Sequence, residues 1–479
     1  YANEEALRYY RQMESYLTHL PIEAYWASAL RMYLKRNILH RLNGDYGPAE
    51  ADLTRAFDLA LRYNDTRAEA EAYCLLADLR HYEMRNEESL AAARQAYAIA
   101  STYNYPPELN TSRVQLGIAC QMVGDIERAM EYLQQAHDQA EQRGDQLTLA
   151  RALNTMAVAW WLYQGELDKA LDGFQRVLEI RREAGAKDRE AECLANIANV
   201  QFRRGDFEAA LETSAAALHV GRAAGWQYGL SYVQLDQADV YCYLGDYKTG
   251  QRLIEEAEQN LVPGDDLGQA YVELWLGRNV HCDLGRDDLA TSMLEASLRF
   301  MRDYDHYEEM IRALTALGAS YWRQGRLAQA RACLDEAHEL SLTQHFPWQR
   351  SEICYRLGLV TLAEHDLDEV PHRWDEATSW AQHAQAAVAA GSSPDWLGPI
   401  HLLLARVARQ RGAPVNQVAS LYQQAISLAE SRCRAVERAW ILCEAGHYLG
   451  VHARDANRTQ AQTIVRRAEE WLAARDITR

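Results

Sequence analysis

The sequence predicts an all-α protein, a right-handed solenoid of about eleven helix-turn-helix repeats. Three observations predict this fold class. A glycine followed by a polar residue recurs with spacings of 80, 41, 40, 40, 40 and 40 residues. Small residues keep the same period on both sides of that glycine. Apolar residues recur every three or four positions, as on one face of a helix, and no alternating β-branched run indicates a strand.

The recurring glycine marks the turn inside each repeat. Glycine accepts the positive φ that ends a first helix, and an acidic residue just beyond it can cap the second helix. Forty residues make two helices of about 16–18 residues plus two short turns. The turn glycines are Gly44, Gly124, Gly165, Gly205, Gly245, Gly285 and Gly325.

Two columns of small residues predict where the paired helices cross. One column lies five residues after each glycine, and the other lies seven or eight residues before it. Small side chains at both places let two antiparallel backbones approach closely. The later column holds Ala49, Ala129, Ala170, Ala210, Gly250, Ala290 and Ala330. The earlier column holds Ala77, Gly117, Ala157, Ala198, Ala238, Gly318, Gly358, Ala405 and Gly446.

Several places along the chain depart from the repeat. An extra first helix is expected near residues 3–20, and residues 84–86 (Met-Arg-Asn) replace the glycine turn of the second repeat. In the ninth repeat the turn is expected at His365, and about seven residues within 366–374 are inserted before the second helix. Residues 391–394 form a looser link. The first helix of the seventh repeat, around Gly277 and Arg278, is ambiguous by one residue.

The predicted organisation is one continuous solenoid rather than several domains, because a single helix pair cannot bury its apolar face alone. Residues 1–363 would hold repeats 1 to 8 and the start of repeat 9. Residues 364–479 would hold the repeat with the insertion and the C-terminal repeats. The polar start at Tyr1 suggests a fragment of a longer polypeptide without a signal peptide.

Composition narrows the classes of function. The formal net charge of −18 disfavours binding of nucleic acid or an anionic membrane by this segment. No stretch of 18 apolar residues predicts a membrane span. The nine cysteines are scattered without a C-x-x-C pair, which favours buried thiols in a reducing cytoplasm over disulfides or zinc.

The repeat resembles the tetratricopeptide repeat. One copy reads Leu194-x-x-Ile197-Ala198, then Gly205-Asp206-Phe207-x-x-Ala210, then Ala217. The period of 40 is longer than the common 34-residue form of that family. Long repeats of this kind resemble those of kinesin light chains, cell-polarity adaptors and the sensor domains of bacterial signalling ATPases, such as the maltose-responsive transcription activator.

The resemblance implies that the first helix of each repeat lines a concave groove. Side chains three before, one after and four after the earlier small residue would then point into the groove. The chaperone-tail binders of this family hold a carboxylate with Lys in the first column and Asn in the second. No Lys fills the first column in this sequence, so such a clamp is disfavoured. The candidate groove residues are Asp78, His81, Asn154, Trp161, Asn199, Phe202, Asp239, Trp322 and Arg406.

The leading functional hypothesis is a scaffold or sensor that binds a protein or peptide along its groove. The partner would be another protein or other domains of the same polypeptide, and the setting a bacterial signalling or regulatory protein. The alternatives are a sensor of a small molecule such as a sugar, and a receptor for a peptide pheromone. No phosphate loop, H-E-x-x-H or G-x-S-x-G occurs, so we expect neither an enzyme nor a cofactor.

One polar cluster has the residue types of metal ligands. It falls in the insertion of the ninth repeat, where a solvated loop is the simpler interpretation, and we expect no metal. Its members are His365, Asp366, Asp368, Glu369, His372 and Asp375.

Overall fold

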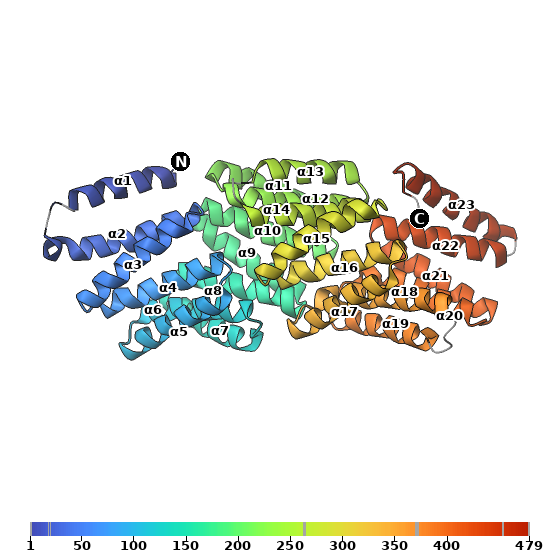
Figure 1. Cartoon of the computed structure of the whole chain (residues 1–479), viewed down its shortest axis with the longest axis horizontal. Helices are drawn as coiled ribbons and strands as arrows, with labels where there is room; N and C mark the ends of the chain where they lie inside the picture. Colours follow the sequence, from blue (N-terminus) through green and yellow to red (C-terminus); the bar gives the residue numbers. More distant parts are fainter. Residues whose placement is uncertain are drawn as a thin grey trace. The chain divides into compact units, whose positions relative to one another are not determined.

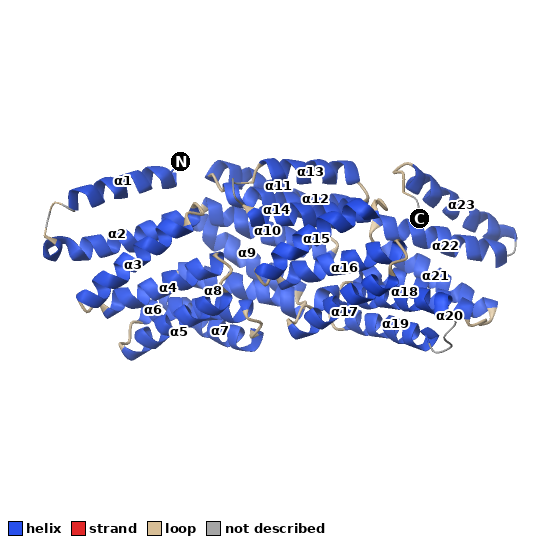
Figure 2. Cartoon of the chain, viewed as in Figure 1, coloured by secondary structure: helices blue, strands red, loops and turns tan. Residues whose placement is uncertain are grey.

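The computed structural model describes residues 2–17, 19, 21–261, 265–368, 373–452 and 455–477. Every regular element in these residues is helical, and no strand occurs among them (Figure 2). Successive helices pack as antiparallel pairs joined by tight turns. The predicted all-α fold of helix-turn-helix repeats is therefore confirmed. No described helix is long and apolar enough to cross a membrane.

The described residues pack as two compact units, which are distinguished below as the N-terminal unit and the C-terminal unit. The N-terminal unit comprises Tyr1–Ala159 and Asp172–Ala186, and the C-terminal unit comprises Trp160–Leu171 and Lys187–Arg479. The predicted division at residues 363 and 364 is a different one, and α18 (Arg350–Asp368) runs through that point. That division and the continuity of the solenoid stay predictions.

The helices of the two units follow one another in chain order (Figure 1). The first ten elements are α1 Ala2–Leu17, α2 Ile22–Leu42, α3 Tyr46–Arg62, α4 Thr66–Tyr82, α5 Asn86–Thr102, α6 Pro106–Met122, α7 Ile126–Arg143, α8 Gln146–Ala159, η1 Trp160–Gln164 and α9 Leu167–Glu183. The remaining elements are α10 Lys187–Arg204, α11 Phe207–Ala224, α12 Gln227–Leu244, α13 Tyr247–Gln259, α14 Asp266–Trp275, η2 Leu276–Cys282, α15 Asp287–Asp303, α16 Tyr307–Arg323, α17 Leu327–Thr343, η3 Pro347–Gln349, α18 Arg350–Asp368, α19 Arg373–Ala389, η4 Pro394–Trp396, α20 Leu397–Gln410, α21 Val415–Ser431, α22 Ala435–His452 and α23 Asp455–Ala473.

The turns inside the repeats use the left-handed backbone that the sequence predicts. Each of the predicted turn glycines has a positive φ, for example 82° at Gly124 and 92° at Gly205. In the second repeat Met84 takes that conformation with φ of 61°, which confirms residues 84–86 as a glycine-free turn. The turn predicted at His365 is wrong, because α18 continues to Asp368. No glycine stops the helix at that point, and the rest of this turn lies outside the described residues.

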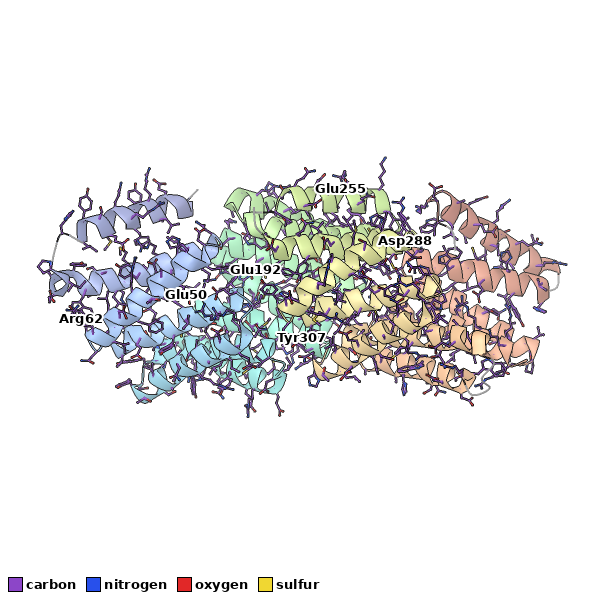
Figure 3. All side chains as sticks on the ribbon, in the orientation of Figure 1. Glu50, Arg62, Glu192, Glu255, Asp288 and Tyr307 are labelled. Carbon is purple, nitrogen blue, oxygen red and sulfur yellow. The ribbon has the colours of Figure 1, made fainter. Side chains whose placement is uncertain are left out.

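The two small-residue columns lie where helices cross, as predicted. Ala238 on α12 is fully buried, and Ala210 on α11 is 1% exposed. A Cβ atom added to Gly318 on α16 would lie 2.5 Å from Cγ of Leu334 on α17, far inside van der Waals contact. These positions are therefore structural, because a larger side chain would force the paired helices apart. By contrast, Glu255 on α13 and Asp288 on α15 are exposed on the second helices (Figure 3).

Two first helices contain a π-helical turn, which explains the ambiguous register of the seventh repeat. In most repeats the small residue precedes the turn glycine by seven positions, but Ala157 precedes Gly165 by eight, and Gly277 precedes Gly285 by eight. In these two repeats the extra residue is taken up by η1 and η2, which are π-helical. Such π-turns are frequent at functional sites.

The C-terminal unit closes on itself through contacts between residues 226 to 230 positions apart. A Cβ at Gly165 would lie 3.2 Å from the carbonyl oxygen of Gly391. Arg432 donates to the carbonyl of Arg204 at 2.8 Å, and Arg475 donates to the carbonyl of Gly245 at 3.0 Å. These contacts join residues that are separated by nearly the same distance in the sequence, slightly less than six repeats of 40 residues. This indicates that one turn of the superhelix takes slightly less than six repeats and that its neighbouring turns touch.

Candidate functional site

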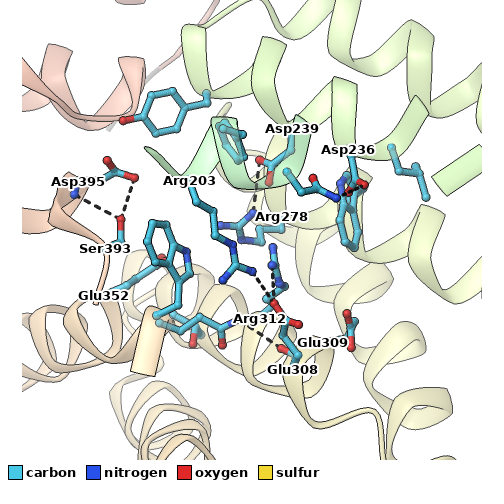
Figure 4. Close-up of a pocket in the computed structure, with 18 of the residues that line it drawn as sticks. Arg203, Asp236, Asp239, Arg278, Glu308, Glu309, Arg312, Glu352, Ser393 and Asp395 are labelled. Carbon is cyan, nitrogen blue, oxygen red and sulfur yellow. Dashed lines mark hydrogen bonds and ion pairs between the residues drawn. The ribbon is translucent and has the colours of Figure 1, made fainter. Parts of the chain in front are cut away.

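The first helices of the C-terminal unit converge on one partly open space, the inner cavity, of about 240 Å³. It is lined by side chains from α10, α12, α14, α16 and α18, by residues of η1 to η4, by Ser393, and by Arg434, which directly precedes α22. Figure 4 shows Arg203, Arg278 and Arg312 meeting acidic side chains at its centre. The inner cavity is therefore the concave face of successive repeats, closed by the superhelical turn.

Aromatic rings form much of the wall of the inner cavity. The guanidinium of Arg203 lies between two indoles, 5.0 Å from the ring centre of Trp161 and 4.9 Å from that of Trp348. Tyr232 and Tyr271 meet edge to face with ring centres 5.2 Å apart. Ring faces carry partial negative charge and attract cations, so the wall holds the Arg203 guanidinium without a full counter-charge on that side.

Glu308 on α16 joins two of the buried guanidinium groups. Arg203 and Arg312 each donate to its Oε1 at 2.8 Å. Arg203 is only 5% exposed, and burial lowers its pKa to about 10 despite the attraction of Glu308. Burial raises the pKa of Glu308, but the two arginines outweigh it and hold the carboxylate below its ordinary value. The cluster therefore remains ionised at neutral pH, with one carboxylate shared between two cations.

Asp239 on α12 lies between two further arginines without a close hydrogen bond. Its Oδ1 is 3.6 Å from Arg278 and 3.5 Å from Arg434, and no hydrogen-bond partner reaches this atom. Asp239 is only 6% exposed. Burial lowers the pKa of Arg278, an effect that the attraction of Asp239 does not cancel. The positive charge at Arg278 is thus only partly compensated.

Asp236, one helical turn before Asp239, is the least compensated anion of the cavity. Its side chain accepts one hydrogen bond, from the Asn199 amide at 2.8 Å. Within the part of the chain that the structure describes, no cationic group lies at ion-pair distance from it. Burial raises its pKa to about 6, and the attraction of Arg312 offsets only part of that rise.

Several polar atoms of the cavity wall have no hydrogen-bond partner. Nε1 of Trp161, Nε1 of Trp275 and Nε of Arg312 are unused donors, and Oδ1 of Asp239 and Oε1 of Gln349 are unused acceptors. A buried polar atom left unpaired costs about 1–3 kcal/mol. Neighbouring atoms cover these groups, so they are unpaired polar atoms packed within the wall of the cavity.

A second hollow of the C-terminal unit, the open groove, is wider and more apolar. It measures about 970 Å³ and lies between α16, α18, α20, α22 and α23. Its polar rim includes Arg406, which donates twice to Glu444 at 2.8 and 2.6 Å. Arg409 is exposed at the same rim. The apolar wall consists of Trp322, Leu359, Leu362, Trp440, Leu472 and Ile477.

The structure distributes the predicted groove residues over three places. Trp161, Asn199, Phe202 and Asp239 meet in the inner cavity. Trp322 and Arg406 meet in the open groove.

The other three predicted residues lie in the N-terminal unit. Asp78 accepts from Arg151 at 3.4 Å; burial raises its pKa, but the nearby arginines more than offset this. Asn154 accepts from Arg181 at 3.2 Å, and burial lowers the pKa of His81. None of the three is among the residues that line either hollow.

Sequence reasoning missed a fourth column on the first helices. The cavity wall includes the residue six positions before the small residue, one helical turn beyond the three columns considered. In successive repeats this position holds Tyr232, Tyr271, Arg312 and Glu352. Extending the same face by one turn would have found these residues, because positions three or four apart lie on one side of a helix. Arg278, omitted for its ambiguous register, also lines the cavity.

Metal ligands are not gathered anywhere in the described residues. His365, Asp366 and Asp368 have no described side chains, and Glu369 and His372 lie outside the described residues, so this cluster stays a hypothesis. No disulfide joins any of the nine cysteines, which are all described, and all but Cys333 are buried, as expected for core thiols.

Fold and site together define a helical-repeat protein whose concave face carries two hollows. The family model for the tetratricopeptide repeat matches residues 148–220 and 275–343. These two segments are therefore tetratricopeptide repeats, as the resemblance implied.

Three known proteins are similar to a part of this chain or to its fold. A Tonsoku-like protein of Bos taurus is 30% identical over 112 residues, which cover 23% of this chain and 8% of that protein. The TPR-sensor signal transduction ATPase of Pyrococcus horikoshii has a TM-score of 0.47 at 15% identity, covering 75% of this chain and 53% of that one. The apo quorum sensor NprR of B. thuringiensis has a TM-score of 0.40 at 14% identity, covering 86% and 99%.

Proposed function

We propose that this chain is a recognition domain that binds a peptide segment of a partner protein in the open groove. The observation that carries the proposal is the groove wall, where two tryptophans and four aliphatic side chains face a hollow of about 970 Å³. The role that we propose is binding rather than catalysis.

An apolar peptide segment is the occupant that fits the open groove. Trp322 and Trp440 are half-buried, so part of each ring stays available to a partner. Aromatic anchors carry a large share of the binding energy once a partner covers them. Arg409 and the Arg406–Glu444 pair at the rim would then orient the peptide backbone or its polar side chains.

The wider setting is part of the same proposal. We place the domain in the cytoplasm, as the recognition arm of a bacterial signalling or regulatory protein. The absence of disulfides among the described cysteines and the composition rich in Ala, Arg and Trp support that setting. The peptide would come from another protein or from another domain of the same polypeptide.

Trp322→Ala tests the proposal directly. Peptides are selected on the whole chain from a phage-displayed random library, and their affinities are measured by calorimetry. Because Trp322 is an anchor, its truncation should weaken binding by about 2 kcal/mol, roughly 30-fold. The control is Trp26→Ala, which removes a half-buried tryptophan stacked on Tyr63 in the N-terminal unit. Equal affinities for both variants, with unchanged melting, would show that the groove is not the site.

A second candidate function, a sensor of a small ligand, is favoured by the inner cavity. The charged side chains and aromatic wall of a 240 Å³ space suit a compact polar molecule better than a peptide. The two functions are compatible, because different residues of the C-terminal unit form the two hollows.

A further inference from the structure

The inner cavity differs from the open groove in holding charges of both signs that its own residues do not balance. We propose that it binds a small zwitterion of the α-amino acid class, with the ammonium group on Asp236 and the carboxylate on Arg278. This site goes beyond the proposed peptide groove and does not depend on it.

The spacing of the two charged anchors suits such a ligand. Asp236 and Asp239 are three residues apart on α12, so their Cβ atoms lie about 5–6 Å apart on one helix face. Arg278 reaches to 3.6 Å from Asp239. The free carboxylate and the guanidinium therefore face the same cavity about one helical turn apart, a span that a molecule with adjacent ammonium and carboxylate groups can bridge.

The surroundings of Asp236 suit a cation. Asn199 supplies one neutral hydrogen bond, and the remaining carboxylate lone pairs have no protein donor in the described residues. Tyr232 lies one turn earlier on α12, and it meets Tyr271, which in turn lies 5.5 Å from the Trp275 ring. A carboxylate beside aromatic rings attracts an ammonium group through both its charge and the ring faces.

The surroundings of Arg278 suit an anion. Its guanidinium donates to Asn279 at 2.7 Å and has only a long contact with Asp239. Arginine offers five N–H donors, so several remain for a carboxylate. A carboxylate at this place would pair with the guanidinium of Arg278.

A neutral ligand of the same size fits less well. A sugar could pair with the unused donors and acceptors, but it would leave the charges of Asp236 and Arg278 as they are. Buried charges are costly unless they are paired, so a ligand that pairs both gains more. A cavity of about 240 Å³ is smaller than the usual pockets of drug-sized ligands, which suits an amino acid rather than an oligosaccharide.

The test uses the whole chain and the twenty free L-amino acids as probes. Each is screened by thermal shift and the binders are measured by calorimetry, beside their methyl esters and a panel of monosaccharides. We expect at least one amino acid to bind saturably. Its ester, which lacks the carboxylate charge, should bind at least tenfold more weakly.

Variants connect the binding to the two anchors. Asp236→Asn and Arg278→Gln should each weaken binding at least tenfold, whereas the exposed control Asp288→Asn should not change it. If Arg278→Gln does not fold, Arg278→Lys keeps the charge but loses the fork of donors, and it should weaken binding less than Asp236→Asn does. Absence of any amino-acid binding, full binding by Asp236→Asn, or binding of a neutral sugar alone would overturn the proposal. Peptide capture by the open groove would be unaffected by these results.

Discussion

Asp236, the proposed anchor for an ammonium group, is a carboxylate whose ionised form lowers the stability of the folded protein. It is partly buried with one neutral hydrogen bond, and burial raises its pKa to about 6, against an ordinary value of 3.8. The native state therefore holds a proton that the unfolded state has lost between these two pH values. This group's contribution to stability is complete below pH 4 and is lost as the pH rises through 6.

Asp236→Asn should therefore stabilise the free protein at neutral pH. Asn199 on α10, Asp239 on α12 and Glu308 and Arg312 on α16 are the groups that act on this carboxyl. Removing its charge should raise the free energy of unfolding by about 1–2 kcal/mol at pH 7.5. The gain should shrink toward zero near pH 4, where the native carboxyl is already protonated. Denaturant unfolding at both pH values measures this, and a destabilised variant at pH 7.5 would contradict it.

Helix pairs are held by positions that admit no larger side chain. Ala238→Leu should cost about 1–3 kcal/mol, because Ala238 is fully buried at the crossing of α12 and α13. Ala216→Leu, at an exposed position of α11, is the matched control and should leave the melting temperature nearly unchanged. Thermal melts that do not distinguish the two variants would mean that the small-residue column is not structural.

Much of the helical architecture could be predicted from the sequence, because the residues that form the turn and the helix crossing of a repeat lie within that repeat. Gly205 and Ala198 are local signals that need no knowledge of the rest of the fold. The spacing of eight residues between Gly277 and Gly285, instead of seven, is likewise a local signal of the π-helical turn. From the sequence it indicated only that the register of this helix is ambiguous. The turn after α18 was misplaced because no glycine marks it.

The candidate site could be predicted only in part, because it depends on the closure of a whole superhelical turn. The columns identified Phe202 and Asp239 as inward-facing, yet nothing local places Arg434 beside residues almost 200 positions earlier. Nor does one repeat reveal that Trp161 and Trp322, equivalent in the sequence pattern, line different hollows. Contacts that arise between turns of the superhelix leave no periodic signal.

At the scale of the C-terminal unit, closure converts a concave face into two distinct hollows. The contacts of Arg432 with the end of α10, and of Arg475 with the end of α12, bring the last repeats onto the first ones of the unit. The inner cavity lies within that turn, and the open groove lies among the last repeats. We infer that a partner is recognised on this inner face.

Hydrogen–deuterium exchange of the whole chain, with and without a selected peptide, tests that claim most directly. Protection reports where the peptide covers or stabilises backbone. We expect slowed exchange in α16, α18, α20 and α22, which border the open groove, and little change in exposed second helices such as α13. Protection confined to the N-terminal unit or to the second helices would contradict recognition on the inner face of the C-terminal unit.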